Sequence, residues 1–289
     1  MHESVAFSAS GSYSHSNSRS SLADAYYKRG LLWLRNFKHD AALQDLDAAI
    51  GMWDCIDDPA NLFRLRGKLY LERGDTNAAT RDCNSALEID PNDEGSHVLR
   101  ALLRLLRGDV TNAIADCNTA LASSPDDEYA YIIRGLARID EQDFTGALLD
   151  ANRALKLDSN GEDAYMVRGR AAVCLELYEP GIQDLTRVLR VKPSSDDYCI
   201  RAWAYLKTRA YMEAISDAKD ALVLEPNSAL AYKEIAMACA SLGQVECATS
   251  AKRAAQKLDP TLTEFGDLGE FKFLVVPPGA EWYQLDEHP

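Results

Sequence analysis

The sequence predicts an all-α protein made of about seven stacked helix-turn-helix units. Three observations support this prediction: a period of 34 residues, small residues that recur at fixed positions of the period, and a proline that recurs near its end. The period is clearest where "RDCNSALEIDPNDE" at 81–94 returns as "ADCNTALASSPDDE" at 115–128. We therefore expect a solenoid in which each unit packs mainly against its neighbours.

The composition is that of a globular protein, with 289 residues of which 47% are hydrophobic and 26% charged. The net charge of −14 opposes attraction to phosphates, so we expect no nucleic-acid partner. The apolar stretches fall far short of the roughly 20 residues that span a bilayer, and the N-terminus does not resemble a secretory signal. We expect no membrane insertion and a cytoplasmic location. Seven cysteines without a Cys-x-x-Cys motif argue against a disulfide framework or a zinc site.

The chain divides into three parts by its composition. Residues 1–22 are rich in serine and lack periodic apolar residues, which predicts a disordered leader. The last part, 263–289, is a tail whose "FKFLVV" run is prone to form a β-strand, and we expect this run to pack on the last unit or to bind a partner. Between them lie the seven units, 23–56, 60–93, 94–127, 128–161, 162–194, 195–228 and 229–262.

Small residues predict where the two helices of each unit touch. The twentieth and twenty-seventh positions are two helical turns apart, so they share the face of the second helix that meets the eighth position of the first. An aromatic residue at the fourth position adds bulk beside the small one, as interlocking helices require. The proline stops the second helix, and an Asp or Asn after it caps the next first helix, as in "PNDE" and "PDDE". The eighth position holds Gly30, Gly67, Ala101, Gly135, Gly169, Ala202 and Ala236.

A second pattern couples arginine at the seventh position with aspartate at the twenty-third. The arginines are Arg29, Arg66, Arg100, Arg134, Arg168 and Arg201, and the aspartates are Asp45, Asp82, Asp116, Asp150, Asp184 and Asp217. Both are absent from the last unit, which has Ile235 and Ala251 instead. Because the arginine and the aspartate are present together in six units and absent together from the seventh, we expect them to form bidentate ion pairs between the two helices of a unit. The alternative is an arginine stripe that binds acidic ligands.

The period, the small residues, the aromatic position and the terminal proline together resemble the tetratricopeptide repeat (TPR) family over roughly residues 23–262. The resemblance implies a right-handed superhelical α-solenoid that holds a protein partner along its concave face. Two units depart from the pattern. The fifth has Gly181 and Val188 where alanine is usual, and the seventh has polar Lys252 and Gln256 on a packing face, as an end-cap would.

The concave face is expected to be lined by the second, fifth, ninth and twelfth positions of the first helices, and the resemblance implies the same positions. This set is unusually apolar and carries a few isolated cations, which suits an extended or helical peptide with hydrophobic anchors. The alternative is a narrow groove whose side chains mostly contact one another. The candidate partner-binding residues are Tyr27, Leu31, Leu34, Arg64, Lys68, Val98, Leu102, Leu105, Ile132, Leu136, Ile139, Met166, Arg170, Val173, Cys199, Trp203, Lys233 and Met237.

Catalytic patterns are not found in the sequence. The five histidines are scattered, and no glycine-rich phosphate loop is present, so we expect no catalytic residue, no cofactor and no metal site. Cys83 and Cys117, in the repeated "DCN" run, are interpreted as small buried core residues. The sequence thus favours a non-enzymatic scaffold or adaptor that binds a peptide or helix of a partner protein.

Two other functions remain open. The "DCNxAL" motif resembles repeat units of TPR proteins that bind the C-terminal carboxylate of the chaperones Hsp70 or Hsp90, so a chaperone is a possible partner. The clamp needs Lys and Asn where the first unit has Tyr27 and Leu31, and no consecutive trio of units fits it. The third function is a structural subunit of a larger complex.

Overall fold

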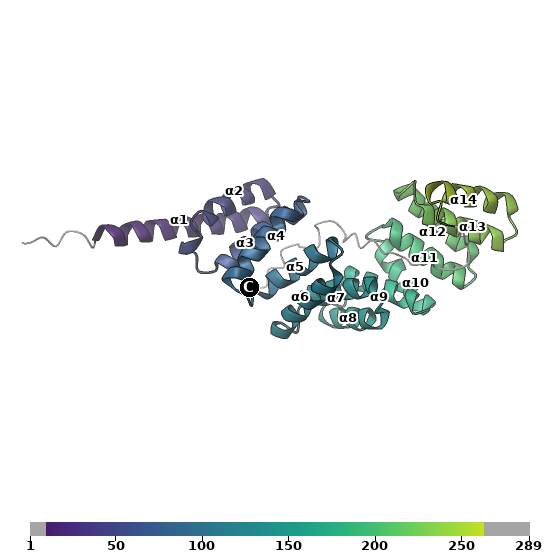
Figure 1. Ribbon diagram of the computed structural model, residues 1–289, viewed down its shortest axis with the longest axis horizontal. Helices are drawn as coiled ribbons and strands as arrows, with labels where there is room; N and C mark the ends of the chain where they lie inside the picture. Colours follow the sequence, from purple (N-terminus) through teal and green to yellow (C-terminus); the bar gives the residue numbers. More distant parts are fainter. Residues whose placement is uncertain (1–9, 263–289) are drawn as a thin grey trace, which may run out of the picture. The chain divides into compact units, whose positions relative to one another are not determined.

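The computed structural model describes residues 10–262, and these residues form α-helices with no β-strand among them (Figure 1). The helices alternate as first and second members of seven pairs, which confirms the predicted all-α repeat solenoid. The first helices are α1 (Ser10–Arg35), α3 (Pro59–Glu72), α5 (Glu94–Leu106), α7 (Glu128–Asp140), α9 (Glu162–Cys174), α11 (Ser195–Lys207) and α13 (Ala229–Ser241). The second helices are α2 (His39–Ile50), α4 (Thr76–Ile89), α6 (Val110–Ser123), α8 (Phe144–Leu157), α10 (Tyr178–Leu189), α12 (Tyr211–Leu224) and α14 (Val245–Leu258).

The helices form two compact units, and the division falls between Pro125 and Asp126. The first unit contains α1 to α6 and a short 3-10 helix, η1 (Trp53–Cys55), and the second contains α7 to α14. Within each unit, every helix packs against the next one along the chain, and first helices also touch the first helices of neighbouring pairs. None of the described helices is long and apolar enough to cross a membrane. The right-handed twist of the stack stays a prediction.

Small residues hold the two helices of each pair close together, as predicted. A Cβ atom added at Gly169 would lie 3.0 Å from Leu185 Cγ and 3.1 Å from Asp184 Cβ. One added at Gly67 would lie 3.3 Å from Asp82 Cβ. On the facing helix of the third pair, Ala113 is fully buried. A larger residue on either side of this contact would therefore push the helices apart.

Each first helix ends in a turn that contains one residue with a positive φ angle. In the second pair this residue is Gly74, whose N–H donates to the Leu71 carbonyl, while the Asp75 N–H reaches back to the Tyr70 carbonyl at 2.9 Å. These two bonds are those of a Schellman motif, which ends a helix without leaving its last carbonyl groups unpaired. The seven residues are Phe37, Gly74, Gly108, Gln142, Glu176, Arg209 and Gly243.

Aspartates after the recurring proline cap the following first helices. The Asp93 carboxylate accepts a hydrogen bond from the Ser96 N–H at 2.7 Å, and Asp127 accepts one from the Ala130 N–H at 2.9 Å. Each bond satisfies one of the free N–H groups at the start of a helix. The predicted caps at "PNDE" and "PDDE" are confirmed.

The N-terminal segment differs from the sequence prediction, because α1 begins at Ser10 inside the segment that we expected to be disordered. Its added turns contact the chain around η1. Arg19 forms an ion pair with Asp54 at 3.2 Å, and the Ser20 hydroxyl donates to the Cys55 carbonyl. These contacts give a serine-rich sequence polar partners that its composition does not reveal. Residues 1–9 and the tail 263–289, including its "FKFLVV" run, lie outside the described residues.

Candidate functional site

The arginine and aspartate of each of the first six pairs form the predicted bidentate ion pair. In every pair the arginine Nε donates to Oδ2 and Nη2 donates to Oδ1 of the aspartate, at distances between 2.6 and 2.9 Å. All six aspartates are buried. The guanidinium of each arginine is therefore bound to an aspartate of the same chain. This favours a structural role for the six arginines over a stripe that binds acidic ligands.

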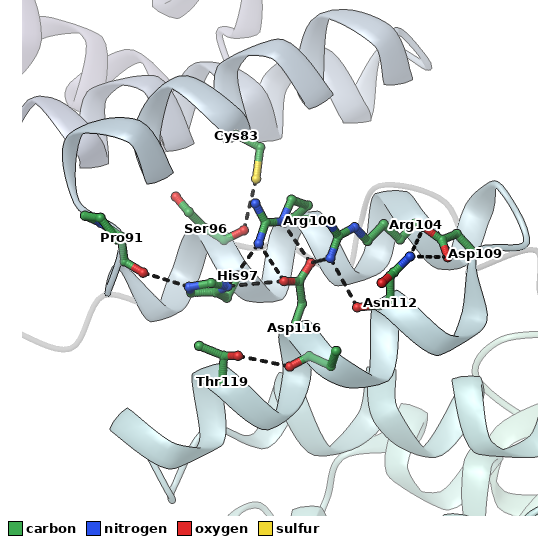
Figure 2. Close-up of polar contacts among 11 residues, drawn as sticks. Cys83, Pro91, Ser96, His97, Arg100, Arg104, Asp109, Asn112, Asp116 and Thr119 are labelled. Atoms are coloured by element: carbon green, nitrogen blue, oxygen red, sulfur yellow. Dashed lines mark hydrogen bonds and ion pairs between the residues drawn. The ribbon is translucent and has the colours of Figure 1, made fainter.

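The third pair has the most connected of these ion pairs, shown in Figure 2. Asp116 on α6 accepts hydrogen bonds from Arg100 Nη2 at 2.7 Å and from Arg104 Nη1 at 2.5 Å, both on α5. His97 Nδ1 lies 3.3 Å from the same carboxylate, and His97 Nε2 lies 2.9 Å from the Pro91 carbonyl oxygen. The carboxylate thus has three basic neighbours from a single helix and little capacity for a further ligand.

The recurring cysteine packs in the core, as the sequence indicated. Cys83 is fully buried, and its thiol donates to the Ser96 carbonyl oxygen at 3.0 Å (Figure 2). Burial raises the pKa of the Cys83 thiol to about 12. Because the thiolate is the reactive form of cysteine, a thiol with this pKa is a poor nucleophile at neutral pH. Cys117, its counterpart one period later, is buried as well.

The candidate partner-binding residues lie on the first helices, but most of them are buried. Those that keep partial exposure are Tyr27, Leu31, Arg64, Lys68 and Met237. The buried ones are Leu34, Val98, Leu102, Leu105, Ile132, Leu136, Ile139, Met166, Arg170, Val173, Cys199, Trp203 and Lys233, and none of them is more than 7% exposed. Only the partly exposed residues, four of which lie on α1 and α3, offer surface to a ligand in this structure.

A chain of polar contacts joins the candidate residues of α1 and α3. Asn61 Nδ2 donates to the Tyr27 hydroxyl at 2.7 Å, and Arg64 Nη2 donates to Asn61 Oδ1 at 2.8 Å. Arg64 Nε also lies 3.2 Å from Asp93 Oδ2. Burial is the main cause that raises the pKa of the Tyr27 hydroxyl, and the hydroxyl is therefore protonated at neutral pH. The expectation that Arg64 is an isolated cation was wrong, because the cap of α5 supplies its carboxylate partner.

In the second unit, Arg170 likewise has a partner that the sequence did not indicate. Its Nε donates to Asp197 Oδ1 at 2.6 Å, and this bond joins α9 to α11 in a site where both side chains are buried. Burial raises the pKa of nearby Asp140 to about 6, although the Arg170 charge acts in the opposite direction. Lys207 lies over the ring of Trp203 at 4.4 Å from its centroid. Arg170 is therefore part of the framework between two first helices.

Glu234 on α13 is a buried carboxylate that sequence reasoning missed. It is 1% exposed, and its carboxylate interacts with the buried thiol of Cys199, which is a weak hydrogen-bond donor. Burial raises its pKa well above the ordinary value for glutamate. Glu234 stands at the sixth position of its unit, and a comparison of the units at that position would have revealed it. The same position in the second to sixth units holds Leu65, Leu99, Ile133, Val167 and Ile200.

One disulfide lies in the seventh pair, between Cys239 on α13 and Cys247 on α14. The sequence argued against a framework of several disulfides, and the odd cysteine count gave no sign of a single bond. The two residues are eight apart, a spacing that matches no metal or redox motif. Only the antiparallel packing of the two helices brings them together, with their Cα atoms 5.9 Å apart.

A tetratricopeptide repeat family model matches the chain at residues 27–94 and again at 64–128. Residues 27–128 of the chain thus contain tetratricopeptide repeats. Solved structures of TPR proteins share the fold of the chain at low sequence identity. A TPR protein from Parabacteroides merdae has a TM-score of 0.57 at 18% identity, covering 83% of this chain and 94% of that one.

Two further structures extend the comparison. PilF of Pseudomonas aeruginosa has a TM-score of 0.58 at 18% identity and covers 70% of this chain and 92% of its own. YrrB, described as a TPR protein with an unusual peptide-binding site, has a TM-score of 0.51 at 18% identity, covering 62% of this chain and 93% of its own. No curated protein matches the sequence significantly. These likenesses show the fold, and TPR folds in general serve as scaffolds for protein–protein interaction.

Proposed function

We propose that this TPR protein is a non-enzymatic scaffold that binds a peptide or helix of a partner protein along the exposed face of its first helices. The proposal is supported by the fold, whose usual role is to hold a partner, and by the likeness to YrrB, which has a peptide-binding site. A cytoplasmic location belongs to the same proposal.

The observation that carries this proposal is the surface formed by Tyr27, Leu31, Arg64 and Lys68 on α1 and α3. These side chains are half-buried, while most of the other candidate residues are buried. Asn61 donates to the Tyr27 hydroxyl and accepts from Arg64, so it joins one residue of α1 to one residue of α3 within this surface. A preformed surface of this kind loses little conformational entropy when a ligand binds.

The chemistry of this surface defines the kind of ligand that it would take. Tyr27 and Leu31 can receive one apolar anchor, and the surface also contains two cationic side chains, Arg64, which already lies 3.2 Å from Asp93 Oδ2, and Lys68, which interacts with Glu72. We therefore propose a partner segment that carries an aromatic or aliphatic residue next to one or two acidic residues. A chaperone C-terminal peptide remains a second candidate, although Tyr27 and Leu31 stand where its clamp needs Lys and Asn.

Selection from a displayed library of random peptides, with the intact chain immobilised, tests this proposal. We expect enrichment of peptides in which an apolar anchor adjoins Asp or Glu. The double variant Leu31→Ser, Lys68→Glu should weaken binding of the selected peptides by about tenfold or more, because it removes an apolar contact and reverses a charge.

The matched control is Leu32→Ser, which changes the neighbouring leucine on α1. Leu32 is 53% exposed and lies outside the proposed surface, so its replacement should leave peptide binding unchanged. Equal binding to the wild-type chain and to the double variant would show that this surface is not the binding site. A preference for the C-terminal peptide of Hsp70 or Hsp90 over the selected peptides would favour the chaperone candidate.

A further inference from the structure

The seventh helix pair lacks the ion pair of the other six and has a covalent link in its place. Ile235 and Ala251 occupy the positions of the arginine and the aspartate. Cys239 and Cys247 are bonded across the turn between α13 and α14, near one end of the pair. The other five cysteines are free. The link between the two helices is thus electrostatic in six pairs and covalent in the seventh.

Helix α14 has little else to hold it in place. Ala251 and Ala255 are its only buried residues, whereas α12 in the preceding pair buries Ala214, Ile215, Asp217, Ala218 and Ala221. Among the helices of residues 10–262, α14 packs mainly against α13. The last element of a repeat array depends on a single interface and is the first to open.

We propose that the redox state of Cys239 and Cys247 controls the docking of α14. The disulfide bond keeps α14 packed on α13, and reduction of the bond lets α14 open. A bond that closes a short loop limits the freedom of the open state, so docking is favoured while the bond is intact. Reduction leaves α14 with two buried alanines and without the arginine–aspartate pair that joins the helices of the first six pairs. Local opening of this helix should then become frequent.

The chemistry is thiol–disulfide exchange with a small-molecule disulfide such as oxidised glutathione. Cys247 is half-buried and Cys239 is fully buried, so the Cys247 thiolate attacks first and expels one small thiolate. Cys239 then attacks Sγ of Cys247 and expels the second one. Two protein thiols lose their hydrogens, and one small disulfide becomes two small thiols. Two reduced small thiols reverse both steps.

Burial disfavours exchange at three of the five free cysteines. It raises the pKa of the Cys83 and Cys174 thiols to about 12, and it raises the pKa of the Cys199 thiol as well, so these thiols form little thiolate. Cys55 is partly exposed and free, which makes it the natural site for a control variant.

Hydrogen exchange of the full-length protein, oxidised and reduced, tests the proposal. We expect amides of α14 to exchange about tenfold faster or more after reduction, while amides of α8 and α10 keep their rates. In a Cys247→Ser variant the α14 amides should exchange fast in both redox states. A Cys55→Ser variant should behave as the wild type does.

Two results would overturn the proposal. If an alkylating reagent modifies both Cys239 and Cys247 in the unreduced protein, as read by peptide mass mapping, the bond does not form. If the bond is mapped but α14 exchanges equally in the two redox states, the bond does not control docking. The wild-type protein alone gives both readouts, so the test does not depend on how well a variant folds.

Discussion

The first six helix pairs and the seventh reach the same local geometry by different chemistry. In the first six, an arginine grips a buried aspartate between the helices, and in the seventh both are replaced and a disulfide is present. All seven pairs keep a Gly or Ala at the eighth position and at the twentieth, such as Ala101 with Ala113 and Ala236 with Ala248. Close packing of small residues therefore determines the helix pairing, and the ion pair adds stability and register to it.

The largest effect that follows from this comparison is expected at Asp116. Replacing Asp116 with Ala leaves Arg100, Arg104 and His97 without their shared carboxylate in a partly buried site. We expect a loss of about 2 to 4 kcal/mol in the free energy of unfolding, because buried charges without a partner are costly. Urea denaturation followed by circular dichroism measures the change.

The control for this variant is Asp47→Ala, in the first pair. Asp47 pairs with Arg66 at 2.6 Å, but its side chain is 52% exposed, so we expect a change below about 1 kcal/mol. Equal effects of the two variants would show that the buried aspartates contribute no more than surface ion pairs. The six pairs would then gain nothing from the chemistry that the seventh lacks.

The sequence predicted those features of the structure that recur with the 34-residue period. The helix pairs, the small contact at Ala113 and the pairing of Arg100 with Asp116 follow from residues that recur, because each recurrence tests the same local geometry again. Features that occur once could not be found in this way. The partner of Arg170 on the next first helix and the Cys239–Cys247 bond depend on how different helices meet in space.

The candidate binding surface was predicted less well for the same reason. Helical position showed which residues share a face, such as Leu102 and Leu136, but exposure depends on everything that packs against that face. Both leucines are at most 3% exposed, so polar replacements there should disturb the packing of the helices as well as any contact with a ligand. Tyr27 and Leu31, at equivalent positions in the first pair, keep part of their surface.

A smaller effect is expected from overpacking the helix contact in the third pair and in the seventh. Ala113 is fully buried, whereas Ala248, at the same position of α14, is half-buried. Ala113→Leu should lower the free energy of unfolding by about 1 to 3 kcal/mol, and Ala248→Leu by less than about 0.5 kcal/mol. Urea midpoints of the two variants provide the measurement. A larger effect at Ala248 would show that α14 is packed at least as tightly as α6.

The smallest effect concerns Glu234, which stands in the seventh pair where the second to sixth pairs have a core aliphatic residue. Burial raises its pKa in the folded state above the unfolded value, and the nearby Asp217 charge acts in the same direction. Protons are therefore bound more tightly by the folded chain, so stability at this residue is greatest below the unfolded pKa and falls as the pH rises through the folded one.

Glu234→Gln keeps the shape of the side chain and removes its ionisation, so it isolates this effect. We expect the variant to be more stable than the wild type by about 1 kcal/mol at pH 8, with a difference that shrinks as the pH is lowered toward 5.5. Glu88→Gln, at an exposed position of α4, should change stability little at either pH. Thermal unfolding at a series of pH values gives the comparison. A constant difference across the series would mean that Glu234 ionises as easily in the folded chain as in the unfolded one, and the seventh pair would then carry no buried titrating group.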